Sequence, residues 1–252
     1  MGYDRTMADY DFRTQRLYVD APLADGANVV CDSDQVNYLL NVLRLGERDR
    51  ILAFNGRDGE WVTEIAGVAR RRCNLNVIAK VRDQEDGPDL ELLFAPLKRA
   101  RLDYMVQKAT EMGTARLRPV LTRRTVPERV NLDRMRANAV EAAEQCGILR
   151  LPEITSPQRL ERVIAGWDAG RRLIFCDEEA EPGSPLTALS QVAPGPLAVL
   201  IGPEGGFETG ERELLRSRPF VVPISLGPRI MRADTAAVAA LALVNAALGD
   251  WR

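Results

Sequence analysis

Two glycine-bearing segments near the C-terminus have the composition of ligand-binding loops. The first, LIGPEGGFETGE, spans residues 200–211, and the second, SLGPRIMRADTA, spans residues 225–236. Each follows an apolar, strand-like run and precedes a helical pattern. Glycine lets a backbone turn with positive φ and approach a ligand closely, because it has no Cβ. Ligands of α/β sheets bind at the carboxyl ends of strands, so we expect the two segments to share one pocket.

The residue types in these segments favour a neutral, purine-bearing ligand over a triphosphate. The first segment lacks the GK[ST] ending of a nucleotide-binding P-loop, and no GxGxxG motif follows an early strand. The second combines Leu226, Ile230 and Met231 with a glycine turn, which would give a pocket apolar walls edged by backbone N–H groups. Asp234 or Thr235 could cap the helix that follows. For each glycine taken alone, an ordinary turn is the alternative interpretation.

The chain contains no histidine. This excludes the commonest general base, the serine–histidine dyads and the usual metal ligands. The four cysteines, at positions 31, 73, 146 and 176, form no CxxC pair, so neither a zinc site nor a disulfide framework is expected. Any chemistry must therefore use carboxylates, Arg, Lys, Tyr, Cys or hydroxyl groups, or depend on a cofactor, and no metal is implied.

The pattern along the chain predicts two domains. Residues 1–13 lack periodicity and are expected to be a flexible leader, and residues 14–84 form a β-rich, barrel-like domain. A polar QEDGPD segment, residues 84–89, is the expected linker. Residues 90–252 alternate strands with helices, which predicts an α/β domain with a mostly parallel sheet. Its expected strands are 90–95, 117–121, 173–176, 197–201 and 220–224, and its expected helices 101–112, 132–146 and 235–248. The last three strands are expected to be buried on both faces, as parallel strands are.

The β-rich domain is expected to contain strands 16–20, 50–55, 60–68 and 74–82. The Asn55-Gly56 and Asp58-Gly59 pairs predict a tight hairpin between the second and third of these strands. One helix is expected here, with Ser33 or Asp34 as its N-cap.

Charge and hydropathy indicate where the protein acts. Residues 98–136 hold 11 Lys or Arg against 4 Asp or Glu, a local charge of +7 in a chain of net charge −2. Such a patch could meet phosphates, although a solvated helix face is an equally good interpretation of charge alone. The first 25 residues have no apolar core like that of a signal peptide, and the longest apolar run, residues 236–248, is shorter than the ~20 residues of a membrane span. The expected location is the cytoplasm, without a membrane partner.

The two glycine-bearing segments resemble the signature of the SPOUT methyltransferases. Within that superfamily, the segments IGPEGGF at 201–207 and LGPRIMRADTA at 226–236 resemble those of the family that methylates N3 of a uridine in 16S ribosomal RNA. Further similar segments are QRLYV at 15–19, VLRL at 42–45, QKATEMG at 107–113 and EAAEQCG at 141–147. The resemblance implies a PUA-like RNA-recognition barrel over 14–84 and a SPOUT domain with a trefoil knot over 90–252. It also implies bound S-adenosylmethionine, a homodimer, and 16S rRNA of the small ribosomal subunit as partner.

The resemblance assigns roles to particular residues. Arg232 is the leading catalytic candidate, because a fixed guanidinium could stabilise the anion of uridine N3. Glu204 and Glu144 are alternative bases, and Phe175 could join Cys176 as a third wall of the pocket. The expected cofactor contacts are Cys176, Ile201, Gly202, Pro203, Gly205, Leu226, Gly227, Ile230, Met231 and Thr235. The expected RNA contacts are Arg16, Arg44, Lys98, Arg101, Lys108, Arg123 and Arg124.

Two other functions remain open at this point. A SPOUT enzyme that methylates a ribose 2′-hydroxyl would have similar loops. A non-catalytic RNA-binding assembly factor could retain the same fold, although the intact glycine segments argue against it.

Overall fold

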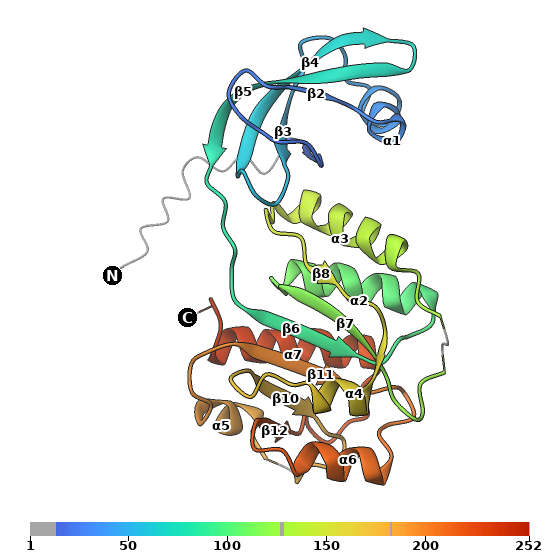
Figure 1. Ribbon diagram of the computed structural model, residues 1–252, viewed down its shortest axis with the longest axis vertical. Coiled ribbons are helices and arrows are strands. Elements are labelled where there is room, and N and C mark those ends of the chain that lie inside the picture. Colours follow the sequence, from blue (N-terminus) through green and yellow to red (C-terminus); the bar gives the residue numbers. More distant parts are fainter. Residues whose placement is uncertain (1–13, 127–128, 182, 252) are drawn as a thin grey trace. The chain divides into compact units, whose positions relative to one another are not determined.

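The computed structural model describes residues 14–126, 129–181 and 183–251 (Figure 1). The predicted leader, residues 1–13, lies outside the described residues. The chain divides into two compact units. Unit 1 comprises the described residues up to Glu85 together with Glu144–Arg150, and unit 2 comprises Asp86–Ala143 and the described residues from Leu151 onward.

Unit 1 is built on a five-stranded sheet with the order β1-β3-β4-β5-β2. Strand β1 runs parallel to β3, and the other pairs are antiparallel. Alternate residues of the sheet enclose a core that includes Leu17, Ile51, Ile65 and Leu75. The strands are β1 (Arg16–Tyr18), β2 (Asn28–Val30), β3 (Arg50–Phe54), β4 (Glu60–Ala69) and β5 (Arg72–Arg82).

The hairpin predicted between β3 and β4 is confirmed. Asn55 Oδ1 accepts hydrogen bonds from the backbone N–H groups of Arg57 and Asp58, at 3.0 and 2.9 Å. Gly59 has φ +85°, and a Cβ there would lie 2.2 Å from the Arg82 carbonyl oxygen. The loop therefore requires glycine both for its backbone conformation and for the close passage of β5.

The N-cap of the unit 1 helix lies one residue before the first of the two predicted caps. The helix consists of α1 (Ser33–Val36) and a π-helical continuation, η2 (Asn37–Val42). Asp32, not Ser33 or Asp34, is the N-cap, and its carboxylate accepts from the N–H groups of Asp34 and Gln35 at 2.9 and 2.8 Å. Asp32 is the last residue with extended backbone before the helix, so its side chain can accept hydrogen bonds from these N–H groups of the first turn.

Unit 2 contains a sheet whose strands are all parallel, in the order β12-β10-β11-β6-β7-β8, with β9 pairing the far end of β7. The chain forms β6 and β7 first. The strands that precede the glycine segments, β11 and β12, lie on the other side of β6. The strands are β6 (Leu90–Phe94), β7 (Arg116–Leu121), β8 (Glu153–Ile154), β9 (Gln158–Arg159), β10 (Arg172–Cys176), β11 (Leu197–Ile201) and β12 (Val221–Ile224).

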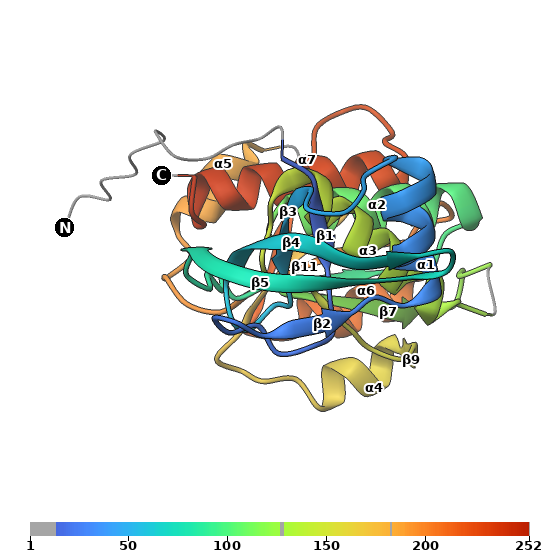
Figure 2. The same ribbon diagram turned by 90° about the horizontal axis from the view of Figure 1, so that it is seen from above.

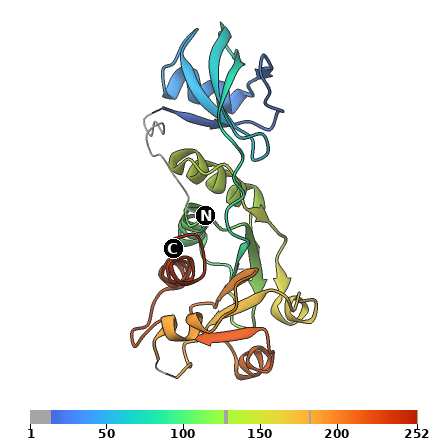
Figure 3. The same ribbon diagram turned by 90° about the vertical axis from the view of Figure 1, so that its left-hand side faces the viewer.

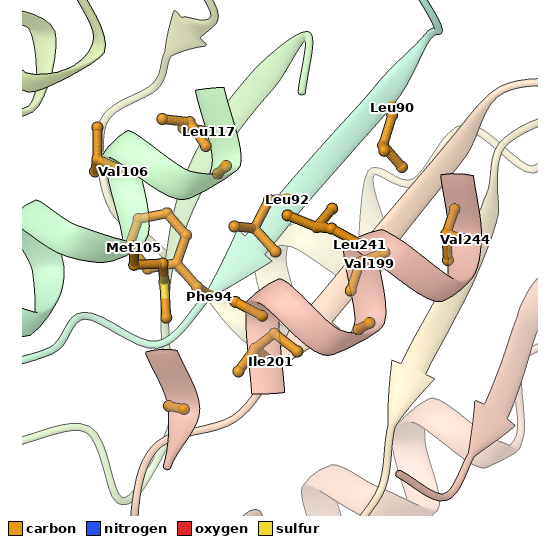
Figure 4. Close-up of a cluster of buried hydrophobic side chains, with 14 of the residues drawn as sticks. Leu90, Leu92, Phe94, Met105, Val106, Leu117, Val199, Ile201, Leu241 and Val244 are labelled. Carbon is orange, nitrogen blue, oxygen red and sulfur yellow. The ribbon is translucent and has the colours of Figure 1, made fainter. Parts of the chain in front are cut away.

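Helices cover both faces of this sheet, with α2 and α7 on one side and α4 and α6 on the other (Figure 3). Residues of β6 and β11 alternate between the two cores: Leu92 and Val199 face α2 and α7 (Figure 4), whereas Leu93 and Leu200 face the opposite layer. The helices are α2 (Arg99–Glu111), α3 (Leu132–Cys146), α4 (Leu160–Ala165), α5 (Pro185–Ser190), α6 (Thr209–Arg216) and α7 (Ala233–Ala247).

Two expectations about unit 2 need correction. Strand β12 is not buried on both faces: it is the edge strand, with Val221 and Val222 half-buried and Pro223 exposed. Helix α7 begins at Ala233 after Arg232, so neither Asp234 nor Thr235 is its N-cap. The Asp234 carboxylate instead accepts from the Thr235 N–H at 3.0 Å.

Helix α7 buries only one of its faces. Ala237, Leu241 and Val244 are buried, whereas Val238 and Leu243 are half-buried. Within the residues that the structure describes, none of the helices combines the length and apolar character needed to cross a bilayer. The predicted trefoil knot concerns how the chain threads through itself, which strand order does not establish, so it stays a prediction.

Candidate active site

The carboxyl ends of three neighbouring parallel strands meet around one cavity of about 360 Å³. Figure 1 shows these strands, β10, β11 and β12, in the lower part of unit 2. After β11 the chain forms loop 1 (residues 202–208), and after β12 it forms loop 2 (residues 225–232). Both loops line the cavity, together with residues 176–178 at the end of β10. The expectation that the two glycine segments share one pocket is confirmed.

Most of the predicted cofactor contacts lie on this cavity. Thr235, in the first turn of α7, is not among the lining residues. Phe175 is also not in the wall: it is fully buried beneath it, with its ring centroid 5.0 Å from that of Phe207. The predicted contacts that line the cavity are Cys176, Ile201, Gly202, Pro203, Gly205, Leu226, Gly227, Ile230 and Met231.

The glycines of loop 1 serve different purposes. Gly202 leaves room for a buried ring, because a Cβ there would lie 2.5 Å from Cε2 of Phe207. Gly206 has φ +71°, and its Cβ would lie 2.3 Å from the Glu178 carboxylate. Gly205 is less constrained: a Cβ would make ordinary contacts with Arg124, at 3.5 Å. Gly206 was therefore missed as a site residue, although its position in PEGG was a usable signal.

An ion-pair network between α6 and the end of β10 supports loop 1, and the sequence analysis did not predict this network. Arg212 of α6 binds Asp177 through Nε at 3.0 Å and Glu178 through Nη2 at 2.6 Å. The same Glu178 oxygen accepts the Phe207 N–H of loop 1 at 3.2 Å. Burial opposes the charge of Arg212, but the hydrogen bond to Asp177 and the nearby carboxylates outweigh it and raise the pKa of Arg212. Glu178 thus ties loop 1 to the end of β10.

Cys176 is the residue of the β10 end that brings a thiol to the cavity. Burial raises the pKa of this thiol to about 12. A thiol with so high a pKa stays protonated at neutral pH and is a poor nucleophile. Cys176 therefore contributes an apolar surface rather than covalent chemistry.

Loop 2 presents apolar and basic side chains that are open to solvent. Gly227 has φ +99°, a conformation that favours glycine, and its N–H donates to Ser225 Oγ at 3.3 Å. Ile230 lines the cavity and is fully exposed, and Arg229 and Arg232 are exposed beside it. The side chains of Arg229, Ile230 and Arg232 are therefore available to a ligand or partner.

The three candidates for catalysis lie in different surroundings. Arg232 is the exposed N-cap of α7; it does not line the cavity, although Met231 and Ala233 on either side do. Glu204 lines the cavity and pairs with Arg101 at 3.3 Å. Glu144 belongs to unit 1, where its carboxylate accepts the Tyr18 N–H at 2.8 Å, so it is bound within unit 1 and does not line the cavity.

Two of the predicted RNA contacts are attached to loop 1. Arg101 pairs with Glu204, and Arg124 donates from Nη1 to the Gly205 carbonyl oxygen at 2.8 Å. Arg123, next to Arg124, pairs with Glu161 at 3.3 Å. Arg101 and Arg124 thus contact loop 1 directly, whereas the ion pair of Arg123 is with α4.

The remaining predicted RNA contacts are dispersed. Lys98 is exposed at the start of α2, and Lys108 binds Glu111 at 2.7 Å. Arg44 is exposed in unit 1, with φ 57°. The prediction for Arg16 was wrong: this residue is only 5% exposed, and its Nε binds Glu60 at 2.9 Å inside unit 1.

The lining of the cavity fits a ligand that is apolar at one part and cationic at another. Leu226, Met231 and Ala236 provide apolar walls, and the glycine loops provide backbone N–H and C=O groups. The half-exposed side chain of Glu178 borders the same space, whereas the Asp177 carboxylate is fully buried in ion pairs with Arg212 and Arg216. A volume of about 360 Å³ lies in the range of small-molecule sites. S-adenosylmethionine, with an adenine ring and a sulfonium, matches this chemistry.

Comparison with known proteins identifies the family. Residues 84–245 match the RNA methyltransferase domain family, and residues 30–78 match the RNA methyltransferase PUA domain family. The ribosomal RNA small subunit methyltransferase E of Rickettsia conorii is 31% identical, over 91% of this chain and 94% of that protein. The protein of the same name from Synechocystis is 32% identical, over 92% of this chain and 78% of that protein.

Solved structures agree with this fold. A putative methyltransferase of Legionella pneumophila, in complex with its cofactor S-adenosylmethionine, is 27% identical with a TM-score of 0.83, over 94% of this chain and 99% of that one. The ribosomal RNA small subunit methyltransferase E of Neisseria gonorrhoeae has a TM-score of 0.84 at 22% identity, over 95% and 100% of the two chains. The predicted architecture, a PUA-like domain followed by an α/β methyltransferase domain, is confirmed. This chain therefore belongs to the RNA methyltransferase family that includes ribosomal RNA small subunit methyltransferase E.

Proposed function

We propose that this protein methylates N3 of a uridine in the 16S ribosomal RNA of the small ribosomal subunit, in the cytoplasm, with S-adenosylmethionine as donor. The observation that carries the proposal is the single cavity shared by loop 1 and loop 2 in a chain of this family. The α/β domain, residues 90–252, would perform the transfer, and the PUA-like domain, residues 14–84, would bind RNA.

The lining residues divide into two groups in their proposed contact with the cofactor. Gly202, Gly205 and Gly227 would allow close approach of the backbone, while Leu226 and Met231 would pack against adenine. When bound, S-adenosylmethionine supplies an activated methyl group. The chain itself has to orient the uridine and stabilise the loss of its N3 proton, because the protonated nitrogen is a poor nucleophile.

Arg232 is the residue proposed to stabilise the uridine anion. The charge of that anion spreads over the two carbonyl oxygens beside N3, and a guanidinium can donate to such oxygens. Its exposed position, adjacent in sequence to the lining residues Met231 and Ala233, leaves the side chain available to a substrate at the mouth of the cavity. Glu204 is the proposed base, since it lines the cavity with an exposed side chain whose carboxylate pairs with Arg101 at 3.3 Å.

The role of Arg232 is tested by substitution. Arg232→Ala should lower kcat by roughly 10²–10³-fold, the cost of removing one donor from a developing anion, with the Kd for S-adenosylmethionine unchanged. Arg218→Ala, which removes an exposed arginine beyond α6, is the matched control and should keep full turnover. Full turnover of Arg232→Ala with intact cofactor binding would remove Arg232 from the mechanism.

The function itself is tested by incubating labelled S-adenosylmethionine with small subunits from cells that lack this protein. Nucleoside analysis should then find label in N3-methyluridine. A methyl group on N3 blocks Watson–Crick pairing and stops reverse transcriptase at one position. Label in a 2′-O-methyl nucleoside would indicate the ribose methyltransferase instead, and absence of S-adenosylmethionine binding by calorimetry would indicate a non-catalytic assembly factor.

We also propose that the active protein is a homodimer. Support comes from the half-buried apolar face of α7, which includes Val238 and Leu243, and from the exposed Ile230 of loop 2. A second copy could cover these side chains and complete each site. Sedimentation equilibrium at micromolar concentration should give twice the mass of the chain, and a monomer under those conditions would contradict the proposal.

A further inference from the structure

One end of the unit 1 sheet gathers arginines from separate segments of the chain. Two are in the loop between η2 and β3, one begins β3, two form the turn between β4 and β5, and one begins β5. We refer to this set as the arginine end: Arg44, Arg48, Arg50, Arg70, Arg71 and Arg72. All six are exposed.

Backbone contacts bring these segments together. The Arg48 N–H donates to the Ile65 carbonyl at 2.8 Å, and Ile65 N–H donates to the Asp49 carbonyl at 2.9 Å. Glu47 accepts the N–H groups of Gly67 and Val68 at 3.0 and 2.8 Å. The loop before β3 is therefore attached to the last residues of β4, just before the turn. Figures 1 and 2 show this turn on the same side of unit 1 as α1.

The acidic side chains at this end are already engaged. Asp32 binds the N–H groups that begin α1, and Glu47 binds those at the end of β4. Asp49 accepts the Gly46 N–H at 2.7 Å, and Glu64 lies 3.7 Å from Arg50.

Arg50 is therefore the one member of the set for which the described part of the chain provides an acidic partner. Five guanidinium groups, those of Arg44, Arg48, Arg70, Arg71 and Arg72, are left without one among the residues described.

Such an arrangement is unfavourable for the isolated protein. Like charges repel, and both Arg44 and Arg48 adopt left-handed backbone conformations, with φ 57° and 70°, which a residue with a Cβ rarely adopts. The whole chain has a net charge of −2, so a generally basic composition does not explain the set. A polyanion would offset the repulsion, and the planar guanidinium group matches the oxygens of a phosphate.

We propose that the arginine end of unit 1 binds the phosphate backbone of the RNA substrate and so contributes to substrate affinity rather than to the transfer step. This inference rests on the proposed function, which supplies the RNA. It extends the binding surface from Arg44 to five further arginines outside the basic stretch at residues 98–136.

Two double variants test the inference, and each of them removes two positive charges. Arg70→Gln with Arg71→Gln removes two charges from the β4–β5 turn. The matched control is Arg57→Gln with Lys80→Gln, which removes two exposed charges near the opposite end of β4, where Trp61 pairs with Lys80. Arg44→Gln, in another segment of the arginine end, gives an independent measure. Thermal unfolding of each full-length variant checks that the fold is kept.

The measurements use a protein-free 16S rRNA transcript and intact small subunits between about 50 and 200 mM salt. Each phosphate contact contributes about 0.7 to the slope of log K against log salt for unpaired RNA, so loss of two contacts should lower the slope by about 1.4 and weaken binding roughly 25-fold at about 0.1 M salt. KM for the RNA should rise accordingly, while kcat and the Kd for S-adenosylmethionine remain unchanged. The control double variant should bind as the unchanged protein does.

Several outcomes would overturn the inference. If the unchanged protein binds and methylates RNA, but the two double variants bind equally well or are weakened equally, the arginine end has no specific role. If the turn variant weakens binding to subunits but not to the transcript, the partner is a ribosomal protein and not RNA. If the unchanged protein neither binds nor methylates the RNA, the proposed function itself fails, and the inference fails with it.

Discussion

The contact between Gly202 and the ring of Phe207 should make loop 1 intolerant of a single methyl group. A Cβ at position 202 would lie 2.5 Å from Cε2 of that ring, and 3.0 Å from Cδ2 and Cζ. The ring cannot easily move, because Phe207 is 1% exposed and packs edge-on against Phe175. Gly202→Ala is therefore a case of overpacking in a closed core.

The expected magnitudes follow from packing. Overpacking of this kind costs about 1–3 kcal/mol, so Gly202→Ala should destabilise unit 2 by about 2 kcal/mol. Phe207→Leu removes the clashing atoms but leaves a void, at a cost of about 1–2 kcal/mol in the otherwise unchanged protein. In the double variant the new methyl group partly fills that void. The double variant should therefore lose about 1–2 kcal/mol less free energy of unfolding than the sum of the losses in the two single variants.

Urea unfolding of the four proteins in this double-mutant cycle measures the coupling. Calorimetric titration with S-adenosylmethionine should show weaker binding to Gly202→Ala and partial recovery in the double variant, since the same clash displaces loop 1. Gly210→Ala is the control: its Cβ meets nothing within 4 Å on α6, and it should stabilise by about 0.5–1 kcal/mol. Simple additivity of the two substitutions would show that the ring does not limit position 202.

Two further predictions concern the end of β10. Glu178→Ala should raise the Kd for S-adenosylmethionine roughly tenfold, because the Phe207 N–H and a buried guanidinium lose a shared acceptor. Glu179→Ala is the matched control, since Glu179 binds the same guanidinium at 3.1 Å but does not line the cavity; an equal loss in both variants would contradict the role of Glu178 in holding loop 1. With a pKa near 12 instead of 9.0, Cys176 should carry about 10³-fold less thiolate at pH 8 than an ordinary cysteine. Iodoacetamide should therefore modify the exposed Cys146 well before Cys176, with Cys176 reacting only as the pH approaches 12; mass spectrometry of peptides measures both, and rapid labelling of Cys176 at pH 8 would refute the reasoning.

The sequence by itself determined the elements whose signals are local. Long apolar runs and glycine stops predicted β6, β11, α2 and α3 within a few residues, because burial and backbone conformation act over neighbouring positions. The Asn55–Gly59 hairpin was equally readable, since its turn is built from its own side chains. Short elements such as β2, β8, β9, α4 and α5 were missed, because two to six residues carry too little periodicity to show their partners.

The sequence predicted the parts of the site that depend on local backbone conformation. It did not predict the parts that depend on contacts between side chains distant in the sequence. Glycines at strand ends located the shared cavity, because Gly206 and Gly227 have positive φ and Gly202 leaves room for a buried ring. The support of loop 1 by Glu178 and Arg212 joins residues 34 positions apart, and no local pattern records it.

The same limit explains the errors in charge. The sequence around Arg16 predicts a surface cation, whereas the structure buries Arg16 in an ion pair with Glu60, 44 positions away. The arginine end of unit 1 likewise forms only when the loop before β3 is hydrogen-bonded to the end of β4. Whether a charge is buried, paired or free depends on pairing between remote segments, and tertiary structure alone decides it.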